Sequence, residues 1–456
     1  MDRLLDLCVD LVLAAPDPGT AEQRHRASAR MLLDALGCAF GAYSDDVPRV
    51  VRAVAARRLQ PDGARVLGTG DRVSPEMACF ANGVMVRYLD FNDAYGSTVG
   101  VGHPSDYIPA VLAAGEMAGA DGVAVLEAIA LTYEIFCRLT DVTKLGVERW
   151  DHVVNGAVAS AAGAARIRGL SRSQVRHALS LALVPNVALQ VTRLNGVSMW
   201  KGCASANAAR NGLFAAELAE AGISGPDQPF RGRGGLFSAI ASSPDIDAWD
   251  RPRDAILDCN IKRYPAGYFA QGAVQAALEL REAGIASEHV VAVKVGTFAF
   301  GVKVMAGDRE KWRPTTRETA DHSLPYVVAR ALAYGKLDRD SFDEAGLLDP
   351  TTLRLLNMLT VEIDDACEEA WPAACMNTVS VLLDNGIRHS RRIRHYRGHS
   401  ANPLNQDELV TKFRMMAQPV LGVAATQRLA AAVAALPTST DLNAVLDAAT
   451  LAGSPS

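Results

Sequence analysis

The feature that most constrains the fold is a change in the spacing of apolar residues near residue 260. Before it, apolar residues recur with a helical period, as Ala27, Met31 and Leu36 do within residues 20–40. This spacing predicts helices over residues 20–40, 77–89, 107–118, 123–142, 155–167, 174–182 and 204–221. The first 220 residues therefore predict an all-helical bundle. Its stretch 155–167 is so rich in alanine and glycine that it must pack closely against its neighbours.

After residue 260 the pattern becomes β-rich. Residues 288–304 are β-branched and alternating, which is typical of a strand, and the turn Asp384-Asn385-Gly386 favours a hairpin. Further strands are expected over 358–363 and 377–383, with helices over 322–334, 407–415, 424–435 and 442–451. The sequence therefore predicts a mainly α fold with an α+β insertion. Residues 1–265 and 400–456 form the helical domain, and residues 266–399 form a smaller α+β lid domain.

Composition narrows the class of protein. The chain has 456 residues, which is too many for one ordinary core, and its 49% hydrophobic and 21% charged residues are typical of a globular protein. A net charge of −5 argues against nucleic acid as a partner, and an anionic substrate would need a locally basic pocket. The first residues carry acids and do not resemble a signal peptide, and no uninterrupted apolar run reaches the roughly 20 residues that span a bilayer. We expect a cytoplasmic protein that does not contact a membrane.

The eight cysteines are scattered and none forms a C-x-x-C pair, so clustered zinc and iron–sulphur patterns are absent. Most lie in apolar helical runs and are expected to be buried thiols. The arginines 388, 391, 392, 394 and 397 form a basic run. We interpret it as the solvated face of an edge strand rather than as a nucleic-acid site.

The first candidate for chemistry is the stretch Leu89 to Tyr95 with the motif Gly102 to Asp106. It holds Asp90 and Asp93, three residues apart, and then His103. The segment between them is too rich in glycine to be helix, so the acids and the histidine are expected on a flexible connection between two helices. A structural alternative is that Ser105 or Asp106 simply caps the next helix.

Other polar residues stand at the junctions of expected elements. They are His152, Lys201, Lys262, Asp321 and His322, with Tyr326 just inside the expected helix 322–334. Three of these places are at or near helix N-termini, which favour anions. Each has a structural alternative: His152 as a cap residue, Lys201 as a surface lysine, and Asp321 and Ser323 as helix N-caps. Their recurrence across both expected domains favours a site at the domain interface.

Several motifs resemble the MmgE/PrpD family, which includes 2-methylcitrate dehydratases, cis-aconitate decarboxylase and an iminodisuccinate epimerase. They are DFNDAY with GHPSD, RWDH, SMWKGCASANAARNG, KRYPA and KWRPTTRETADHSLPYVVARAL, spread over residues 20–415. GHPSD, MWKGCA and RETADHSLPY look closest to the 2-methylcitrate dehydratase branch. The resemblance implies a large helical domain, a smaller α+β lid, an active site between them and a homodimer. It also implies no cofactor and neither a metal nor an iron–sulphur cluster.

Carried over position by position, the resemblance implies two groups of site residues. The catalytic group is Asp90, His103, His152 and Tyr326, and the substrate-binding group is Asp93, Lys201, Lys262, Asp321 and His322. Two departures leave the exact substrate open. Ala94 stands where relatives often have threonine, with Thr98 as a candidate to supply the hydroxyl, and Gly267-Tyr268 stand where some relatives place histidine or glutamate.

The implied chemistry is dehydration of 2-methylcitrate or a related 2-hydroxy tricarboxylate, in propionate catabolism or in a specialised pathway. It needs a base at the carbon, an acid at the hydroxyl and cations for the carboxylates. His103 or Asp90 suits the base or the acid, the two lysines suit the clamps, and His152 suits a donor to developing charge. Decarboxylation or epimerisation of a related polycarboxylate would use the same groups. A non-catalytic scaffold that binds a small acid is the alternative of a different class.

Overall fold

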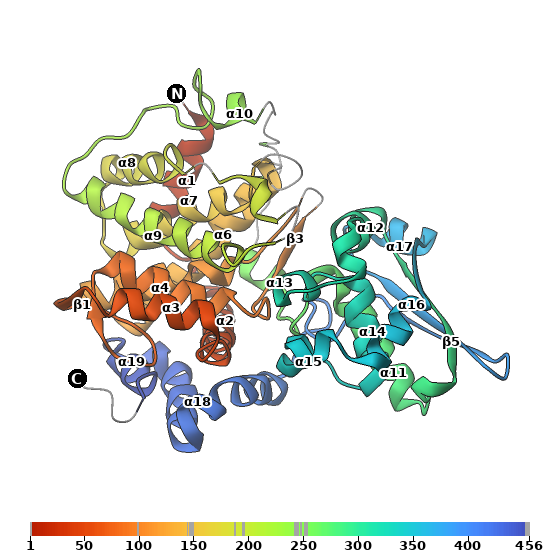
Figure 1. Ribbon diagram of the computed structural model, residues 1–456. Helices are drawn as coiled ribbons and strands as arrows, with labels where there is room; N and C mark the ends of the chain where they lie inside the picture. Colours follow the sequence, from red (N-terminus) through yellow and green to blue (C-terminus); the bar gives the residue numbers. More distant parts are fainter. Residues whose placement is uncertain are drawn as a thin grey trace. The chain divides into compact units, whose positions relative to one another are not determined.

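The structure is a computed structural model that describes residues 2–97, 100–143, 145, 150–186, 188–193, 197–240, 246, 249 and 254–451. Contacts divide the chain into two compact units (Figure 1). The first unit consists of Met1–Thr192, Met199–Cys259 and Asn405–Ser456, and the second consists of Arg193–Ser198 and Asn260–Leu404. Each unit is described by itself.

Helices make up most of the first unit. They are α1 (Arg3–Leu13), α2 (Ala21–Gly41), α3 (Asp46–Ala55), α4 (Pro75–Arg87), α5 (Ile108–Ala118), α6 (Gly122–Thr143), α7 (Val153–Ile167), α8 (Arg172–Leu183), α9 (Lys201–Glu220), α10 (Leu236–Ala239), α18 (Gln406–Ala435) and α19 (Asn443–Ala448). The alanine- and glycine-rich α7 packs against α6, α8 and α9, and a Cβ at Gly212 of α9 would lie 2.2 Å from the Ala157 carbonyl oxygen. The close packing that the small residues predict is confirmed.

The first unit is not all-helical, which corrects the sequence-based expectation. β1 (Leu59–Arg65) pairs with β2 (Arg72–Val73), and β3 (Tyr95–Ser97) pairs antiparallel with β4 (Gly100–Gly102). The described part of the glycine-rich connection, which was expected to be flexible, therefore forms two paired strands. The Tyr95 hydroxyl anchors it by donating to the Asp141 carboxylate of α6, at 2.8 and 3.0 Å. Thr98 lies outside the described residues.

The second unit contains a four-stranded sheet in the order β6-β5-β7-β8. Its strands are β5 (Val290–Thr297), β6 (Leu359–Ile363), β7 (Asn377–Leu383) and β8 (Arg388–Ile393), with β5 and β6 parallel and the other pairs antiparallel. Gly386 turns the β7–β8 hairpin with a φ of +81°, so the predicted turn is confirmed. β8 is the edge strand, and Arg388, Arg391 and Arg392 on it are exposed, as the basic run predicts.

Helices accompany this sheet in sequence. They are α11 (Gln271–Glu282), α12 (Ala299–Ala306), α13 (Arg317–Ala320), α14 (Leu324–Tyr334), α15 (Glu344–Leu347), α16 (Pro350–Asn357) and α17 (Asp365–Ala370). The strand expected over 288–304 ends at Thr297, because the alternation stops there and Phe298 stacks on Trp371 with ring centroids 4.5 Å apart. Helix α14 begins after Ser323, whose Oγ accepts from the Tyr326 amide at 3.1 Å. Asp321 is the C-cap of α13 and not an N-cap.

Helix α18 covers the two helices expected over residues 407–415 and 424–435, and α19 lies within the third, expected over residues 442–451. Helix α18 bends at Gly422, where φ is +76°, and it packs along α2 of the first unit (Figure 1). Residues Gln406–Thr438 are the one stretch of the described chain long and apolar enough to cross a membrane, and 22% of its most apolar window is buried. A single helix of this kind is weak evidence for a membrane span, because core helices meet the same criterion of length and composition. All eight cysteines are buried free thiols, as expected.

Candidate active site

The turn after α4 carries the two acids of the first motif. Helix α4 ends at Arg87, and the Asp90 amide donates to the Arg87 carbonyl at 3.1 Å. Asp90 has a φ of +52°, and it is the one non-glycine residue in the described chain with a positive φ. Leu89 and Phe91, on either side of it, are buried in an apolar cluster with Cys38, Ala42 and Met416. Core packing therefore holds the turn in an unusual backbone conformation.

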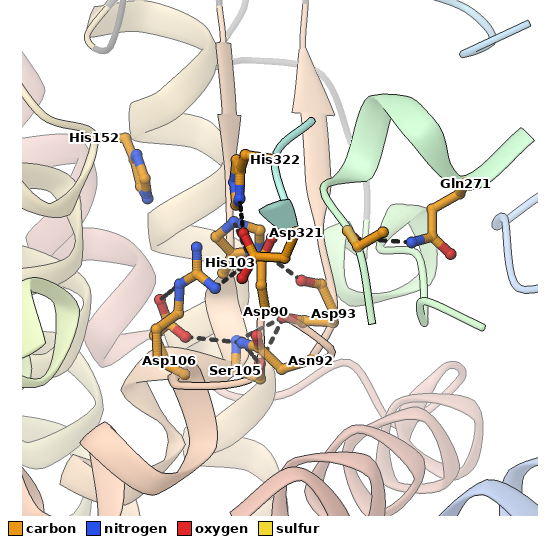
Figure 2. A network of polar contacts seen from close by, with 12 residues as sticks. Asp90, Asn92, Asp93, His103, Ser105, Asp106, His152, Gln271, Asp321 and His322 are labelled. Atoms are coloured by element: carbon orange, nitrogen blue, oxygen red, sulfur yellow. Dashed lines mark hydrogen bonds and ion pairs between the residues drawn. The ribbon is translucent and has the colours of Figure 1, made fainter. Parts of the chain in front are cut away.

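A buried network connects this turn to the segment after β4 (Figure 2). Ser105 donates to Asp93 Oδ1 from its amide at 3.1 Å and from its hydroxyl at 2.6 Å. Asn92 Nδ2 donates to Ser105 Oγ and to Asp106 Oδ1, both at 2.8 Å. Helix α5 has no side-chain cap, so the alternative in which Ser105 or Asp106 caps it is wrong. These side chains instead fix the acidic turn against the segment that carries His103.

One guanidinium group serves two carboxylates of the network. Arg87 pairs with Asp90 through one terminal nitrogen, and its Nε lies 3.5 Å from Asp106 Oδ2. The Arg87 side chain is 1% exposed and both carboxylates are fully buried. Because an unpaired buried charge is costly, the Arg87 guanidinium is well placed to balance the negative charge of Asp90 and Asp106.

Asp93 is the third buried carboxyl group. Burial raises its pKa to about 7, and the charge of Asp106 also raises it, whereas hydrogen bonds from Ser105 and Tyr133 lower it. Asp93 therefore exchanges its proton near neutral pH.

His103 follows β4 and is held by the same turn. Its Nδ1 donates to the Asp93 carbonyl oxygen at 2.7 Å, and its Nε2 lies 3.9 Å from Asp90 Oδ1. Because a carbonyl oxygen only accepts, Nδ1 carries the hydrogen, and a neutral His103 has its lone pair on Nε2. The turn thus sets both the orientation and the tautomer of the ring.

A second imidazole lies beside the first. The rings of His103 and His152 are edge to face, with centroids 5.9 Å apart. His152 Nδ1 contacts Asp151 Oδ1 at 2.9 Å, and its Nε2 is buried without a hydrogen-bond partner among the described residues. Only glycine fits at position 102 between them, because a Cβ there would lie 2.3 Å from Phe136 and 3.3 Å from His152. Most buried polar atoms in folded proteins have a hydrogen-bond partner, so this nitrogen is a candidate contact for a ligand.

Lys201 is the first residue of α9 and is 4% exposed. The alternative in which it is a surface lysine is therefore wrong. A helix N-terminus and an ammonium group both attract anions, so a buried lysine at this place favours a carboxylate ligand. The helix begins earlier than the expected residue 204, which is why the sequence pattern left Lys201 outside it.

In the second unit, Lys262 is fully buried in a segment that Gln271 braces. The Gln271 amide oxygen accepts from the amides of Arg263 and Tyr264, at 3.1 and 3.2 Å. The Gln271 Nε2 donates to the carbonyls of Tyr264 and Ala266, both at 2.9 Å. One side chain thus satisfies four backbone groups and fixes the course of the segment that follows Lys262.

The turn between α13 and α14 contains Asp321 and His322. Asp321 is 1% exposed, and its Oδ1 contacts His322 Nδ1 at 2.5 Å. The Asp321 carbonyl accepts from the Gly267 amide at 2.8 Å, which ties this turn to the segment after Lys262. The second unit therefore holds Lys262, Asp321 and His322 on two connected segments.

Tyr326 lies in the core of the second unit with its side chain fully buried. Its hydroxyl donates to the Ser341 carbonyl at 2.5 Å, and burial raises its pKa. In this position the hydroxyl forms a structural hydrogen bond, and a catalytic role for Tyr326 stays a prediction.

Within either unit alone, the described residues contain no group of three His, Cys, Asp or Glu side chains placed to hold a metal ion.

The sequence analysis missed several residues of this architecture. Asn92 lies inside a quoted motif but was assigned no role, Asp106 was considered only as a helix cap, and Gln271 had no signal in the pattern. Arg87 did have a signal in the sequence, because it is the single charged residue in the apolar stretch 77–89. A lone charge on a helix that must be buried indicates a buried partner of opposite sign.

Comparison with known families gives the decisive observation. The MmgE/PrpD N-terminal domain matches residues 15–248, and the MmgE/PrpD C-terminal domain matches residues 264–438. The chain belongs to the MmgE/PrpD family. The resemblance that the motifs carry is thus confirmed. The N-terminal match contains the acidic turn, both histidines and Lys201, whereas Lys262 lies in the MmgE/PrpD chain between the two matched segments.

Curated MmgE/PrpD relatives match over most of their length. The 2-methylcitrate dehydratase of Cupriavidus necator is 28% identical over 378 residues, which is 78% of this chain and 77% of the relative. That of Salmonella typhimurium is 26% identical and covers 84% of both chains. The cis-aconitate decarboxylase of Mus musculus is 27% identical over 412 residues, which is 87% of this chain and 83% of the relative. At such identities the names of these relatives support a lyase role for this chain.

Proposed function

We propose that this MmgE/PrpD protein is a hydro-lyase that dehydrates 2-methylcitrate or a related citrate-type 2-hydroxy tricarboxylate to an aconitate-type product. The observation that carries the proposal is the pair His103 and His152, two adjacent imidazoles whose Nδ1 atoms have different partners. Dehydration needs one group to take a proton from carbon and another to give a proton to the departing hydroxide.

In this proposal His103 is the base. Its Nδ1 hydrogen is held by the Asp93 carbonyl, so Nε2 presents a lone pair without any change of tautomer. Asp90, 3.9 Å from Nε2, balances the charge that His103 acquires with the proton. The proposal therefore assigns the base to His103 and the balancing charge to Asp90, two roles that the sequence left open between them.

His152 is the proposed acid. The Asp151 carboxylate accepts from Nδ1 whether the ring is neutral or cationic, so Nε2 can give a proton to the leaving hydroxyl and later recover one without the ring turning. The buried, unpartnered Nε2 is the atom that would face the substrate. Lys201 and Lys262 are the proposed carboxylate clamps, because each is a buried cation on a segment of fixed conformation.

The proposal requires no metal ion, since the lysines and histidines supply the positive charge that stabilises the aci-carboxylate. The experiment that tests it is turnover of 2-methylcitrate, citrate and cis-aconitate, followed by the absorbance of the new double bond and by product analysis. Formation of the unsaturated acid from the hydroxy acid supports the proposal. No reaction, with only a thermal shift on ligand addition, supports a binding scaffold instead.

Decarboxylation is the second candidate, because the mouse cis-aconitate decarboxylase matches 87% of this chain. The same base and clamps would serve it, and release of carbon dioxide from cis-aconitate distinguishes it from dehydration.

We also propose a homodimer. Exposed apolar residues of α18, among them Met415 and Val423 at 55% and 54%, are available for a subunit contact. Light scattering of the purified protein tests it.

A further inference from the structure

Helix α18 returns from the C-terminal end of the chain to contact the acidic turn. Lys412 on this helix is 7% exposed, and its Nζ donates to the Phe91 carbonyl at 2.8 Å. The same Nζ lies 2.6 Å from Asp34 Oδ1 of α2 and 4.0 Å from the centroid of the Phe91 ring. Lys412 therefore holds both the backbone and the side chain of one turn residue.

These contacts account for the donors of the ammonium group. A lysine has three N–H donors, and Lys412 meets a carboxylate, a carbonyl and an aromatic face. Asp34 neutralises the charge inside the protein, where an unpaired ammonium would be costly. Lys412 is thus placed to act on Phe91 rather than on a substrate.

Phe91 occupies a decisive place in the turn. It follows Asp90, whose φ is +52°, and it precedes Asn92 and Asp93. A residue in the left-handed region persists only where its surroundings determine its conformation. The fixed Phe91 carbonyl sets the plane of the Phe91–Asn92 peptide, which lies in the chain between Asp90 and Asp93.

We propose that Lys412 is a positioning residue for the reaction assigned above. By fixing Phe91, it holds Asp90 beside His103 Nε2 and the Asp93 carbonyl beside His103 Nδ1. The inference rests on the proposed function and extends it to a residue 321 positions further along the chain than Phe91.

The test needs a variant that removes the contact without leaving a buried charge. Lys412→Met alone would leave Asp34 unpaired, so the main variant is Lys412→Met combined with Asp34→Asn. Lys412→Arg keeps a charge and donors and is the rescue variant. Gln406→Ala is the matched control, because Gln406 accepts a hydrogen bond from Arg30 between the same two helices without touching the turn. Circular dichroism and thermal melting establish that each variant is folded.

In the folded double variant, we expect kcat to fall about 10- to 100-fold with KM changed by less than about threefold, because misplaced catalytic groups lower the rate of the chemical step. Lys412→Arg should recover part of the loss, and Gln406→Ala should keep the native kcat. A second measurement is the nuclear magnetic resonance signal of the His103 Nδ1 hydrogen in histidine-labelled protein. The signal should be protected from exchange in the native protein and lost in the double variant.

The two measurements separate the possible outcomes. Loss of kcat together with loss of the His103 signal supports the inference. A native kcat, a change confined to KM, or a lowered kcat with an unchanged His103 signal overturns it. If the native protein turns over none of the citrate-type acids, the proposed function fails, and the His103 signal alone decides whether Lys412 positions the ring.

Discussion

The rings of His103 and His152 lie edge to face with centroids 5.9 Å apart, yet their Nδ1 atoms contact different kinds of oxygen. His103 donates to the backbone carbonyl of Asp93, and His152 contacts the carboxylate of Asp151. A carbonyl oxygen fixes a tautomer without adding charge, whereas a carboxylate can also balance a cationic ring. This difference between two otherwise similar groups is the basis for assigning them separate roles.

The first prediction separates those roles. His103→Gln should lower kcat by about 10²- to 10⁴-fold and abolish exchange of the substrate's carbon-bound proton in heavy water. His152→Gln should lower dehydration to a similar degree while the carbon-bound proton still exchanges. The surface variant His289→Gln should leave both rates native, since its side chain is 59% exposed. Native exchange in His103→Gln would show that His103 is not the base.

The second prediction concerns Asp90. Asn tolerates the left-handed backbone that Asp90 adopts, so Asp90→Asn should fold and yet lose nearly as much kcat as His103→Gln. The combination of the two changes should be little worse than either, because residues that act as a unit are not additive. Additive losses in the double variant would mean that Asp90 acts independently of His103.

The third prediction uses the pKa of Asp93. A carboxyl group whose folded-state pKa is raised stabilises the fold fully below its unfolded-state pKa, and this contribution is lost as the pH rises through the folded-state pKa. For Asp93, a rise from 3.8 to about 7 corresponds to roughly 4 kcal/mol of unfolding free energy lost between about pH 4 and pH 7. Asp93→Asn has no proton to lose, so its unfolding free energy should vary less over this range. Urea unfolding of both proteins at several pH values measures the difference, and equal pH dependence in the two would refute it.

The fourth prediction concerns the clamps. Lys201→Met and Lys262→Met should each cost roughly 2–4 kcal/mol of transition-state stabilisation, read from kcat/KM. Methionine is chosen because both lysines are buried, at 4% and 0% exposure, and a smaller residue would leave a cavity. Near-native kcat/KM in both folded variants would assign the lysines a structural role.

The fifth prediction is that turnover survives prolonged chelation. The expected rate after treatment equals that of untreated protein, because the proposed charge stabilisation comes from lysine and histidine side chains. Loss of activity that zinc, iron or magnesium restores would contradict this expectation. The measurement compares initial rates before chelation, after it and after each metal is added back.

Secondary structure was predictable where one periodicity dominates. The alternation over residues 377–383 coincides with β7, and the helical spacing over residues 123–142 lies within α6. The expected strand 288–304 was too long, because an apolar stretch such as 299–306 suits a short helix equally well. Periodicity alone does not separate these two outcomes in so short a segment.

The candidate site was predictable in part. The acidic turn and His103 were expected together because they are close in sequence, and the structure adds how they meet, at Asp93 through its backbone carbonyl. Local patterns carry no information about Lys412, which reaches the turn from the far end of the chain. The same applies to the choice of Arg87 as the partner of Asp106, since both residues have other chemically suitable neighbours.

The return of α18 to the first unit limits how the chain can be divided. A fragment that ends at residue 259 would contain both imidazoles and the acidic turn but would lack α18, leaving Asp34, Leu89 and Phe91 without their covering helix. Such a fragment is expected to bind a separately supplied peptide of residues 405–456. Most of the second unit is inserted between Cys259 and Asn405, so any change to that insertion must still let residues 405–456 pack on the first unit. A gene fusion or a split reporter built on this protein must therefore keep residues 405–456 together with residues 1–259.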